Sequence, residues 1–348
     1  MTNKRVKYID ALRGFTMFLV VLGHVLLTSL NIGGYDSVLS GIILTFRMPM
    51  FFFISGFIGY KALYRWTTSF YLFSLKKKLR VQIIPAAFFF SLYTICQGVN
   101  PIICFSHGFG GYWFTFVLLE MFICYFTLSY IANKLHHHLI MDFGMIVLSL
   151  LGVMVLLFLR NESNLWNFLC LENLTKYFQF FTFGILCRKY ENQLFKILRN
   201  DIFKAIIIMA FIVGLLLYFD IIPNNIYLYK FNHDIIIRYV GLLLVFIFFY
   251  QKKGFWEKNK KISSVFLFIG RRTLDIYLIH FFLLPNLKFM TYWISKEGMF
   301  VIQLTVSVLV TIIIIALCLL ISELIRTSDT LSYYLLGVNK NKQKSESI

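Results

Sequence analysis

The sequence predicts an all-α, polytopic integral membrane protein with about ten transmembrane helices and both termini in the cytoplasm. Three observations predict it: 59% of the 348 residues are hydrophobic and only 14% are charged, apolar runs recur from end to end, and basic residues gather in alternate connecting loops. Soluble domains are about half apolar and about a quarter charged. The composition therefore argues against a soluble fold.

The apolar runs set the number of helices, because a bilayer core needs about 20 apolar residues per helix. The sixth run is short, and charged residues in the ninth place its true start nearer 273. The predicted spans cover residues 12–30, 41–60, 81–97, 112–132, 140–159, 177–187, 205–219, 235–250, 263–285 and 300–325. We assign residues 1–330 to a single transmembrane domain and residues 331–348 to a short cytoplasmic tail.

The distribution of Lys and Arg gives the orientation, because cytoplasmic loops carry an excess of both. With the N-terminus inside, the predicted inside segments hold 24 of the 34 Lys and Arg residues and the outside segments hold 5. The net charge of +18 is therefore explained by basic cytoplasmic loops that face anionic lipid. The expected partners therefore include membrane lipids and no nucleic acid.

The cysteines and the histidine run predict no metal site. The six cysteines show no Cys-x-x-Cys spacing, and most fall inside apolar runs, where a cysteine is usually a small buried hydrophobe. Cys104 and Cys170 fall outside the predicted spans, but no pattern supports a bridge between them. The run 136–138 is typical of a solvated turn, since no carboxylate or cysteine accompanies it at ligand spacing.

The first span carries two ionisable residues, Arg13 and His24. Each such residue costs about 2.5–3.5 kcal/mol on insertion scales, so each suggests a functional site. They are eleven residues apart, which on a helix places them within about 20° of one face and about 16 Å apart along the axis. This arrangement suits one polar groove, with a cation at its mouth for a phosphate or carboxylate and an imidazole deeper inside.

Each of these two residues also has a simpler interpretation. Arg13 is equally explained as a cytoplasmic anchor that snorkels to the interface, and His24 as a hydrogen-bonded structural histidine. Imidazole is the side chain whose ordinary pKa lies nearest neutrality, which makes His24 the candidate general base.

The second span reads FRMPMFFFISGF at residues 46–57. Arg47 lies in its outer part and is followed by Pro49, which frees backbone carbonyl groups there. Ser55 and Gly56 permit close packing with another helix. The alternative for Arg47 is an arginine at the outer interface of a kinked helix.

The segment KKKLRVQIIP at residues 76–85 precedes the third span. Its three lysines are best explained as cytoplasmic anchors. Arg80 enters the helix, and its guanidinium makes it the better candidate for contact with a phosphate group.

The fourth and ninth spans supply the remaining candidates. In GYWFTFVLLEMF, Trp113 lies at the outer boundary, where it belongs to a site or only to the aromatic belt, and Glu120 needs an internal partner. In GRRTLDIYLIH, the candidates are Asp275, Tyr277 and His280. His280 is structural, a second group of a ligand site, or the partner of Glu120.

These segments together resemble the membrane-bound acyltransferase family 3, whose members acylate cell-surface glycans, antibiotics or lipid-linked sugars. The match begins with YIDALRGFTMFLVVLGHV, which fits the family's Arg-x10-His opening motif through Arg13 and His24. It continues in order with FRMPMFFFISGF, KKKLRVQIIP, YWFTFVLLEMF and GRRTLDIYLIHFFLL. One departure is the pair Lys77-x-x-Arg80, where the family usually shows Arg-x-x-Arg.

The resemblance implies a multi-pass protein of the bacterial cytoplasmic membrane that moves an acyl group, usually acetyl, to a hydroxyl of a cell-surface or lipid-linked sugar. The donor would be cytoplasmic acyl-CoA (acetyl-CoA), with no metal. His24 would be the catalytic base, and Arg13, Arg80 and Lys77 would bind the donor.

Two alternatives remain open at this point. A secondary transporter or flippase also places charges at mid-membrane. N-acetylation of an amino sugar is the other alternative, because the heparan glucosaminide acetyltransferases have a similar RGF-type opening in their first helix.

Overall fold

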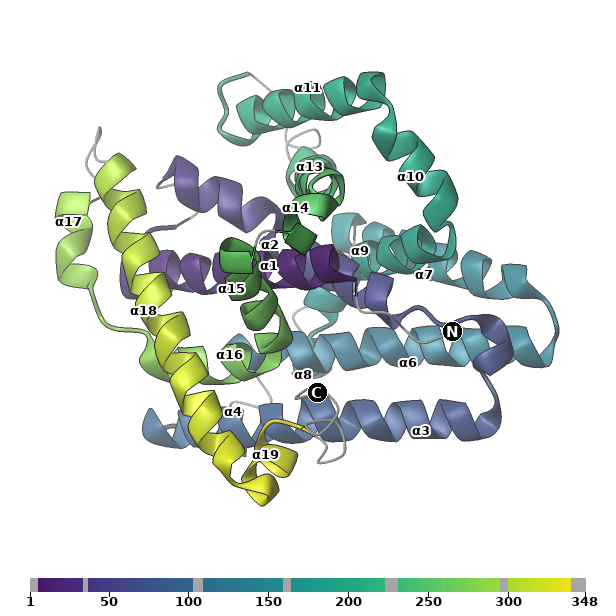
Figure 1. Cartoon of the computed structure of the whole chain (residues 1–348), viewed down its shortest axis with the longest axis horizontal. Helices are drawn as coiled ribbons and strands as arrows, with labels where there is room; N and C mark the ends of the chain where they lie inside the picture. The colour runs from purple at the N-terminus through teal and green to yellow at the C-terminus, as the bar shows by residue number, and fades with distance from the viewer. Residues whose placement is uncertain are drawn as a thin grey trace.

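All regular structure in the described residues is helical, with no strand among them (Figure 1). Seven helical stretches are long and apolar enough to cross a membrane, which confirms the all-α polytopic class. The computed structural model describes residues 6–33, 37–102, 109–158, 164–222, 231–258, 260–294 and 300–338. The seven stretches are Lys7–Ser29, Val38–Gly59, Thr68–Cys96, Gly110–Lys134, Leu139–Leu156, Asp201–Tyr218 and Phe300–Thr327. Cys104 and the tail beyond residue 338 lie outside the described residues.

The other three predicted spans are helices that are shorter or less apolar than these seven. The sixth is α9 (Leu171–Lys189), which begins six residues before the predicted start at 177. The eighth is α13 (Ile237–Gln251), which follows the π-helical turn η5 (Asn232–Ile236).

The ninth predicted span is divided. α15 (Lys260–Arg271) ends at the arginine pair, and α16 (Thr273–Ile279) begins just after it and leads into the 3-10 turn η6 (His280–Leu283). The break agrees with the expected start near 273. Arg272 lies at the break, and its Nη2 donates to Glu323 at 2.6 Å on a neighbouring helix.

The centre of the bundle is built on α1 (Lys7–His24), which continues into the π-helical turn η1 (Val25–Ser29). Glycines let α15 approach it closely. A Cβ atom at Gly14 would lie 2.1 Å from the carbonyl oxygen of Phe266, and one at Gly270 would lie 1.9 Å from that of Asp10. Small residues at helix contacts are typical of membrane bundles.

Glycines also permit close packing between α2 (Val38–Gly59) and α9. A Cβ atom at Gly56 would lie 2.1 Å from the carbonyl oxygen of Phe181, and one at Gly184 would lie 2.0 Å from that of Phe53. The close packing expected of Gly56 is therefore present, and its partner is α9.

A long helix with a π-helical turn in its middle faces α1 and α2. It consists of α3 (Thr68–Lys78), the π-helical turn η3 (Leu79–Ile83) and α4 (Ile84–Cys96), with a proline in the first turn of α4. Beside it runs α6 (Trp113–Lys134), which the short turn η4 (Gly110–Tyr112) precedes. Figure 1 shows α1, α3 and α6 lying roughly parallel. The space between these helices holds the candidate site.

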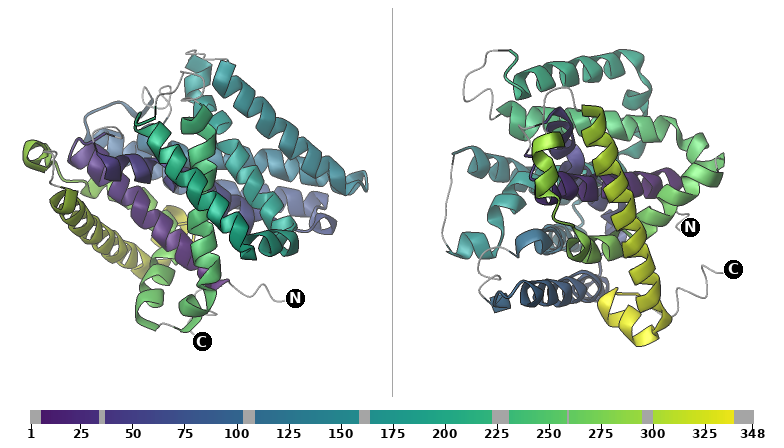
Figure 2. Two further views of the ribbon diagram at one scale, coloured as in Figure 1. Left: turned by 90° about the horizontal axis from the view of Figure 1, so that it is seen from above. Right: turned by 90° about the vertical axis from the view of Figure 1, so that its left-hand side faces the viewer.

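The remaining helices lie mostly around this centre, and Figure 2 shows α11 and α18 at its periphery. Their outward side chains, such as Met209 and Leu324, are more than 60% exposed, as lipid contact requires. These elements are η2 (Leu63–Arg65), α7 (His138–Phe158), α8 (Asn164–Phe168), α10 (Glu191–Arg199), α11 (Asp201–Tyr218), α14 (Lys253–Lys258), η7 (Lys288–Met290), α17 (Thr291–Ile294), α18 (Phe300–Thr327) and α19 (Asp329–Leu335). Because α19 runs across residue 330, the predicted tail boundary falls inside a helix.

Candidate active site

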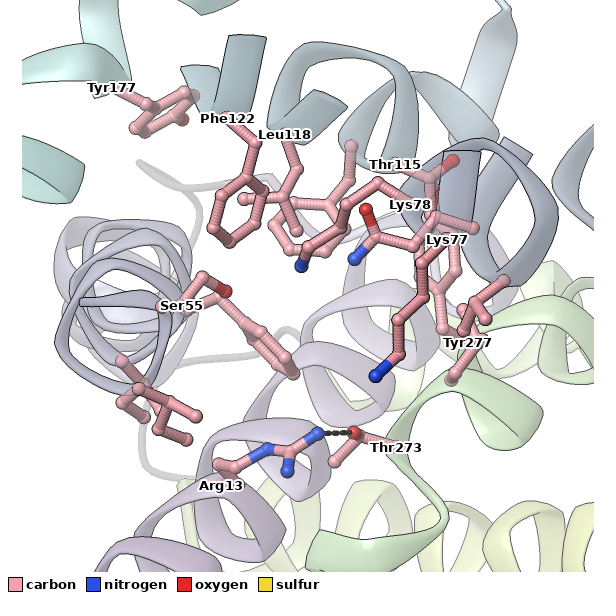
Figure 3. Close-up of a pocket in the computed structure, with 18 of the residues that line it drawn as sticks. Arg13, Ser55, Lys77, Lys78, Thr115, Leu118, Phe122, Tyr177, Thr273 and Tyr277 are labelled. Carbon is pink, nitrogen blue, oxygen red and sulfur yellow. Dashed lines mark hydrogen bonds between the residues drawn. The ribbon is translucent and has the colours of Figure 1, made fainter. Parts of the chain in front are cut away.

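A cavity of about 760 Å³ lies between α1, α2, α3, α6 and α16 (Figure 3). The helical spacing predicts that Arg13 and His24 face one groove, and both lie on its wall. Seven of the residues singled out in the sequence line the cavity: Arg13, His24, Arg47, Ser55, Lys77, Trp113 and Tyr277. The other candidates, Arg80, Glu120, Asp275 and His280, are not on the wall.

One end of the cavity is strongly basic. Nη2 of Arg13 donates to Oγ1 of Thr273 at 2.8 Å, and Figure 3 shows Arg13 and Lys77 pointing into the same hollow from α1 and α3. No carboxylate is among the described residues that line it. The cations at this end of the cavity are Arg13, Lys61, Arg65, Lys77 and Lys78. Such a set suits a ligand that carries several phosphate groups.

The crowding of these cations affects Lys61, which lies just after α2. Burial, together with the charges of Arg65, Lys77 and Arg188, lowers the pKa of Lys61 below its ordinary value. An anion bound at this end would offset the repulsion and raise that pKa again.

Arg80 does not join the basic end. Its Nη1 donates to the hydroxyl of Tyr333 at 2.8 Å, and its guanidinium lies 4.7 Å from the centre of that ring, on α19. The reason is the helical spacing: Lys77, Lys78, Val81 and Gln82 all line the cavity, as residues of one helix face do, and Arg80 lies off that face. The cavity face of this helix therefore passes from Lys77 and Lys78 to Val81 and Gln82 and leaves Arg80 on another side.

Lys78 was expected to be only an anchor, yet it lies on the cavity wall. Its Nζ is 3.4 Å from the ring centre of Phe122, which also lines the cavity. The two lysines thus stand where the sequence placed Arg80.

Two histidines meet near the other end. Nδ1 of His24 lies 3.2 Å from Nε2 of His280. Nδ1 of His280 lies 3.0 Å from the carbonyl oxygen of Ile276 and 2.9 Å from that of Tyr277. Carbonyl oxygens only accept, so Nδ1 of a neutral His280 carries the proton and its Nε2 is an acceptor.

This chain of hydrogen bonds fixes the tautomer of His24. Since Nε2 of His280 accepts, the proton between the rings belongs to Nδ1 of His24, and Nε2 of His24 keeps its lone pair. His24 lines the cavity, whereas His280 is completely buried behind it. Among the three roles left open for His280, the structure favours that of a partner group at the site.

Of the three roles considered for His280, the pairing with Glu120 is not formed, because both ring nitrogens of His280 bind elsewhere. Oε2 of Glu120 is buried without a hydrogen bond among the described residues. Asp275 has a structural environment: its Oδ2 accepts from Oγ of Ser322 and Nη2 of Arg326, each at 2.6 Å, which fastens α16 to α18.

The Arg47 side chain packs against α1 at Gly23, the residue that precedes His24. Its Nη1 donates to the carbonyl oxygen of Val20 at 3.3 Å, and a Cβ atom at Gly23 would lie 1.8 Å from Nη1. Arg47 is only 7% exposed, so it is not an arginine of the outer interface.

Aromatic rings cover the histidine pair. The ring of Phe281 lies 5.0 Å from that of His24 and 5.0 Å from that of Tyr112. A Cβ atom at Gly111 would lie 2.3 Å from Phe281, so the glycine permits this packing. The hydroxyl of Tyr277 donates to the carbonyl of Gly111 at 3.1 Å, which joins α16 to the turn η4.

Two further predicted residues complete the wall. Figure 3 shows the Ser55 hydroxyl facing the hollow. Trp113 stacks on Tyr177 of α9, with ring centres 5.7 Å apart and planes at 16°. Trp113 therefore belongs to the cavity.

The sequence did not single out Lys61, Arg65, Thr273 or Tyr177, although all line the cavity. In the sequence, Lys61 and Arg65 are two of the six charges of the predicted inside segment 61–80, with no pattern that marks them as site residues. Thr273 lies inside the segment GRRTLDIYLIH, where its position next to two arginines was the available signal.

The fold and this site define a multi-pass membrane protein with a buried polar cavity that ends at a histidine. The family model described as the acyltransferase domain (acyltransferase 3) matches residues 6–323. The chain therefore belongs to the membrane acyltransferase 3 family and is a membrane acyltransferase. Neither the curated proteins nor the solved structures give a match.

Proposed function

We propose that this acyltransferase uses cytoplasmic acyl-CoA, typically acetyl-CoA, and moves the acyl group to a hydroxyl of a cell-surface or lipid-linked sugar in the bacterial cytoplasmic membrane. One observation carries the donor assignment: a single cavity joins a cluster of cations, without a carboxylate, to His24. The sugar acceptor rests on the membership of the family.

The chemistry of acyl-CoA fits the cavity wall, which changes from basic at one end to apolar in the middle. Its phosphate groups would meet the basic end, where Arg13, Lys61, Arg65, Lys77 and Lys78 lie. Its long uncharged arm would cross the middle, whose wall includes Met17, Val20 and Leu118. The thioester at the end of the arm would then lie near His24.

His24 would act as the general base. Nε2 takes the proton of the acceptor hydroxyl while the hydroxyl oxygen forms a bond to the thioester carbon. The carbon–sulfur bond then breaks, and the sulfur takes the proton back from His24 and leaves as the free thiol. His280 accepts from Nδ1 throughout and so stabilises the imidazolium in its correct orientation.

The test uses the full-length chain in lipid nanodiscs with acetyl-CoA. Octyl glucoside below its micelle-forming concentration serves as the hydroxyl probe, and glucosamine serves as the amine probe. We expect free CoA and an acetyl ester of the glucoside that hydroxylamine cleaves. An amide on glucosamine alone would support N-acetylation instead. No acyl transfer to either probe, combined with solute transport by vesicles that contain the chain, would support the transporter.

A further inference from the structure

We propose, resting on the acyl transfer proposed above, that Arg47 binds the oxyanion that forms when the thioester carbonyl is attacked. The site that this assigns consists of the Arg47 guanidinium on α2 and Nε2 of His24 on α1. The ligand class is an acyl thioester, of which Arg47 would hold the carbonyl oxygen.

The first support is that Arg47 is buried with hydrogen-bonding capacity to spare. Its Nε is buried without a partner among the described residues. The bond from Nη1 to Val20 is long, at 3.3 Å, and its acceptor is a neutral carbonyl. A buried charge with only such a partner costs several kcal/mol in stability. An anion that forms in the cavity would offset that cost at the moment of reaction.

The second support is the position of Gly23. A side chain there would meet Nη1 of Arg47 at 1.8 Å and its Cζ at 2.7 Å. Only glycine therefore lets the guanidinium lie against α1 at this level, immediately before His24. The backbone brings the cation and the imidazole to one place on the cavity wall.

The third support is the distance from the basic end. Arg47 lies twelve residues before the end of α2 at Gly59, which is about 18 Å along a helix. Lys61 and Arg65 follow that end. Arg47 is thus too deep to share the donor phosphates with them, and it lies at the level where the thioester is expected.

A preorganised cation in a site with little water is an effective way to stabilise a developing negative charge. When the acceptor oxygen attacks, the carbonyl oxygen gains the negative charge and Arg47 binds it. When the carbon–sulfur bond breaks, the charge leaves with sulfur, which His24 protonates. Arg47 donates hydrogen bonds and exchanges no proton.

The experiment compares thioester cleavage with donor binding in the full-length chain in nanodiscs. Cleavage is followed as free CoA from acetyl-CoA with octyl glucoside. Binding is measured with S-ethyl-CoA, a thioether that has the phosphates and the arm but no thioester carbonyl. We expect Arg47→Met to lower kcat by about 10²–10³-fold, the usual loss for one oxyanion donor. The Kd for S-ethyl-CoA should stay within about twofold, because this ligand has no thioester oxygen for Arg47 to bind.

Two further variants separate this role from a structural one. Gly23→Ala keeps Arg47 but displaces its guanidinium, so it should also lower kcat with S-ethyl-CoA binding intact. Arg238→Met is the matched control: Arg238 is buried in α13 and does not line the cavity, so kcat should stay near that of the wild type.

Each other outcome overturns the proposal. Wild-type kcat in Arg47→Met does so directly, and weaker S-ethyl-CoA binding at unchanged kcat would make Arg47 a donor-phosphate group. If Arg47→Met fails to fold, wild-type kcat in Gly23→Ala overturns the proposal. If the wild type binds S-ethyl-CoA but transfers no acyl group to octyl glucoside or glucosamine, acyl transfer itself fails, and the role of Arg47 fails with it.

Discussion

His24 and His280 are separated by 256 residues in the chain, yet their ring nitrogens lie 3.2 Å apart. The spacing within one helix predicts that Arg13 and His24 share a face, and the structure has both on one cavity wall. No local pattern predicts a partner on another helix. Residue-scale prediction therefore identified His280 as a candidate but gave it three alternative roles.

If His280 holds the tautomer of His24, its removal should slow transfer without weakening donor binding. We expect His280→Ala to lower kcat by up to about 10²-fold, the lower end of what a general base contributes. His280→Gln should restore part of the loss, because its amide oxygen can accept from Nδ1 of His24. The measurement is kcat together with the Kd for S-ethyl-CoA. Equal losses in both variants, with folded protein, would contradict the tautomer role.

Lys61 gives a prediction about pH. Its pKa is lowered from 10.5 by burial and by neighbouring cations, and only the charged lysine attracts phosphate. Donor affinity should therefore fall as the pH rises through this lowered pKa, at a pH below 10.5. Lys61→Arg keeps its charge and should reduce this alkaline fall. Titration calorimetry with S-ethyl-CoA at several pH values measures this affinity. An unchanged alkaline fall in Lys61→Arg would exclude Lys61 as the group whose titration weakens donor binding.

At the scale of elements, the apolar runs predicted the existence of the helices better than their local irregularities. The apolar run predicts a start at 177, but α9 begins at 171. Polar residues such as Glu172 and Lys176 interrupt the apolar run without ending the helix. The π-helical turn η3 has no signal in the sequence. Lys78, and not Arg80, lies on the cavity wall, because Lys77 and Lys78 share one helix face with Val81 and Gln82.

This register gives an element-scale prediction for α3 and η3. Lys77→Gln should weaken S-ethyl-CoA binding and reduce its dependence on salt, because a cation is lost from the cavity wall. Arg80→Gln is the matched control, since Arg80 binds Tyr333 instead, and it should leave both quantities near wild type. The reverse pattern would return Arg80 to the donor site and contradict the register.

At the scale of the whole molecule, hydropathy and charge specify the class of fold. Long apolar helices form wherever the runs approach 20 residues, because every backbone polar group must be satisfied inside the bilayer. The packing of helices was less accessible: only the contact at Gly56 was anticipated, and its partner helix was not. The cavity arises from that packing, so its boundary could not be read from any one segment.

The orientation is the whole-molecule prediction. The 24-to-5 distribution of Lys and Arg places the loop 98–111 outside and the segment 188–204 inside. In a background with the native cysteines replaced, a membrane-impermeant thiol reagent should label Val99→Cys in intact cells. It should label Asn192→Cys only after the membrane is permeabilised. Both positions are exposed, so access is limited only by the membrane. The opposite pattern would contradict the orientation.

The central claim is that Nε2 of His24, at the end of the cavity, carries the chemistry of transfer. The most direct measurement is the rate of acetyl transfer from acetyl-CoA to octyl glucoside by His24→Asn and His24→Ala, in nanodiscs, at saturating donor. Asparagine can form hydrogen bonds but cannot act as a base. Both variants should lose about 10²–10⁴-fold in rate, while the protein stays folded and binds S-ethyl-CoA as the wild type does. Near wild-type transfer by His24→Asn would contradict the claim and make His24 a structural residue.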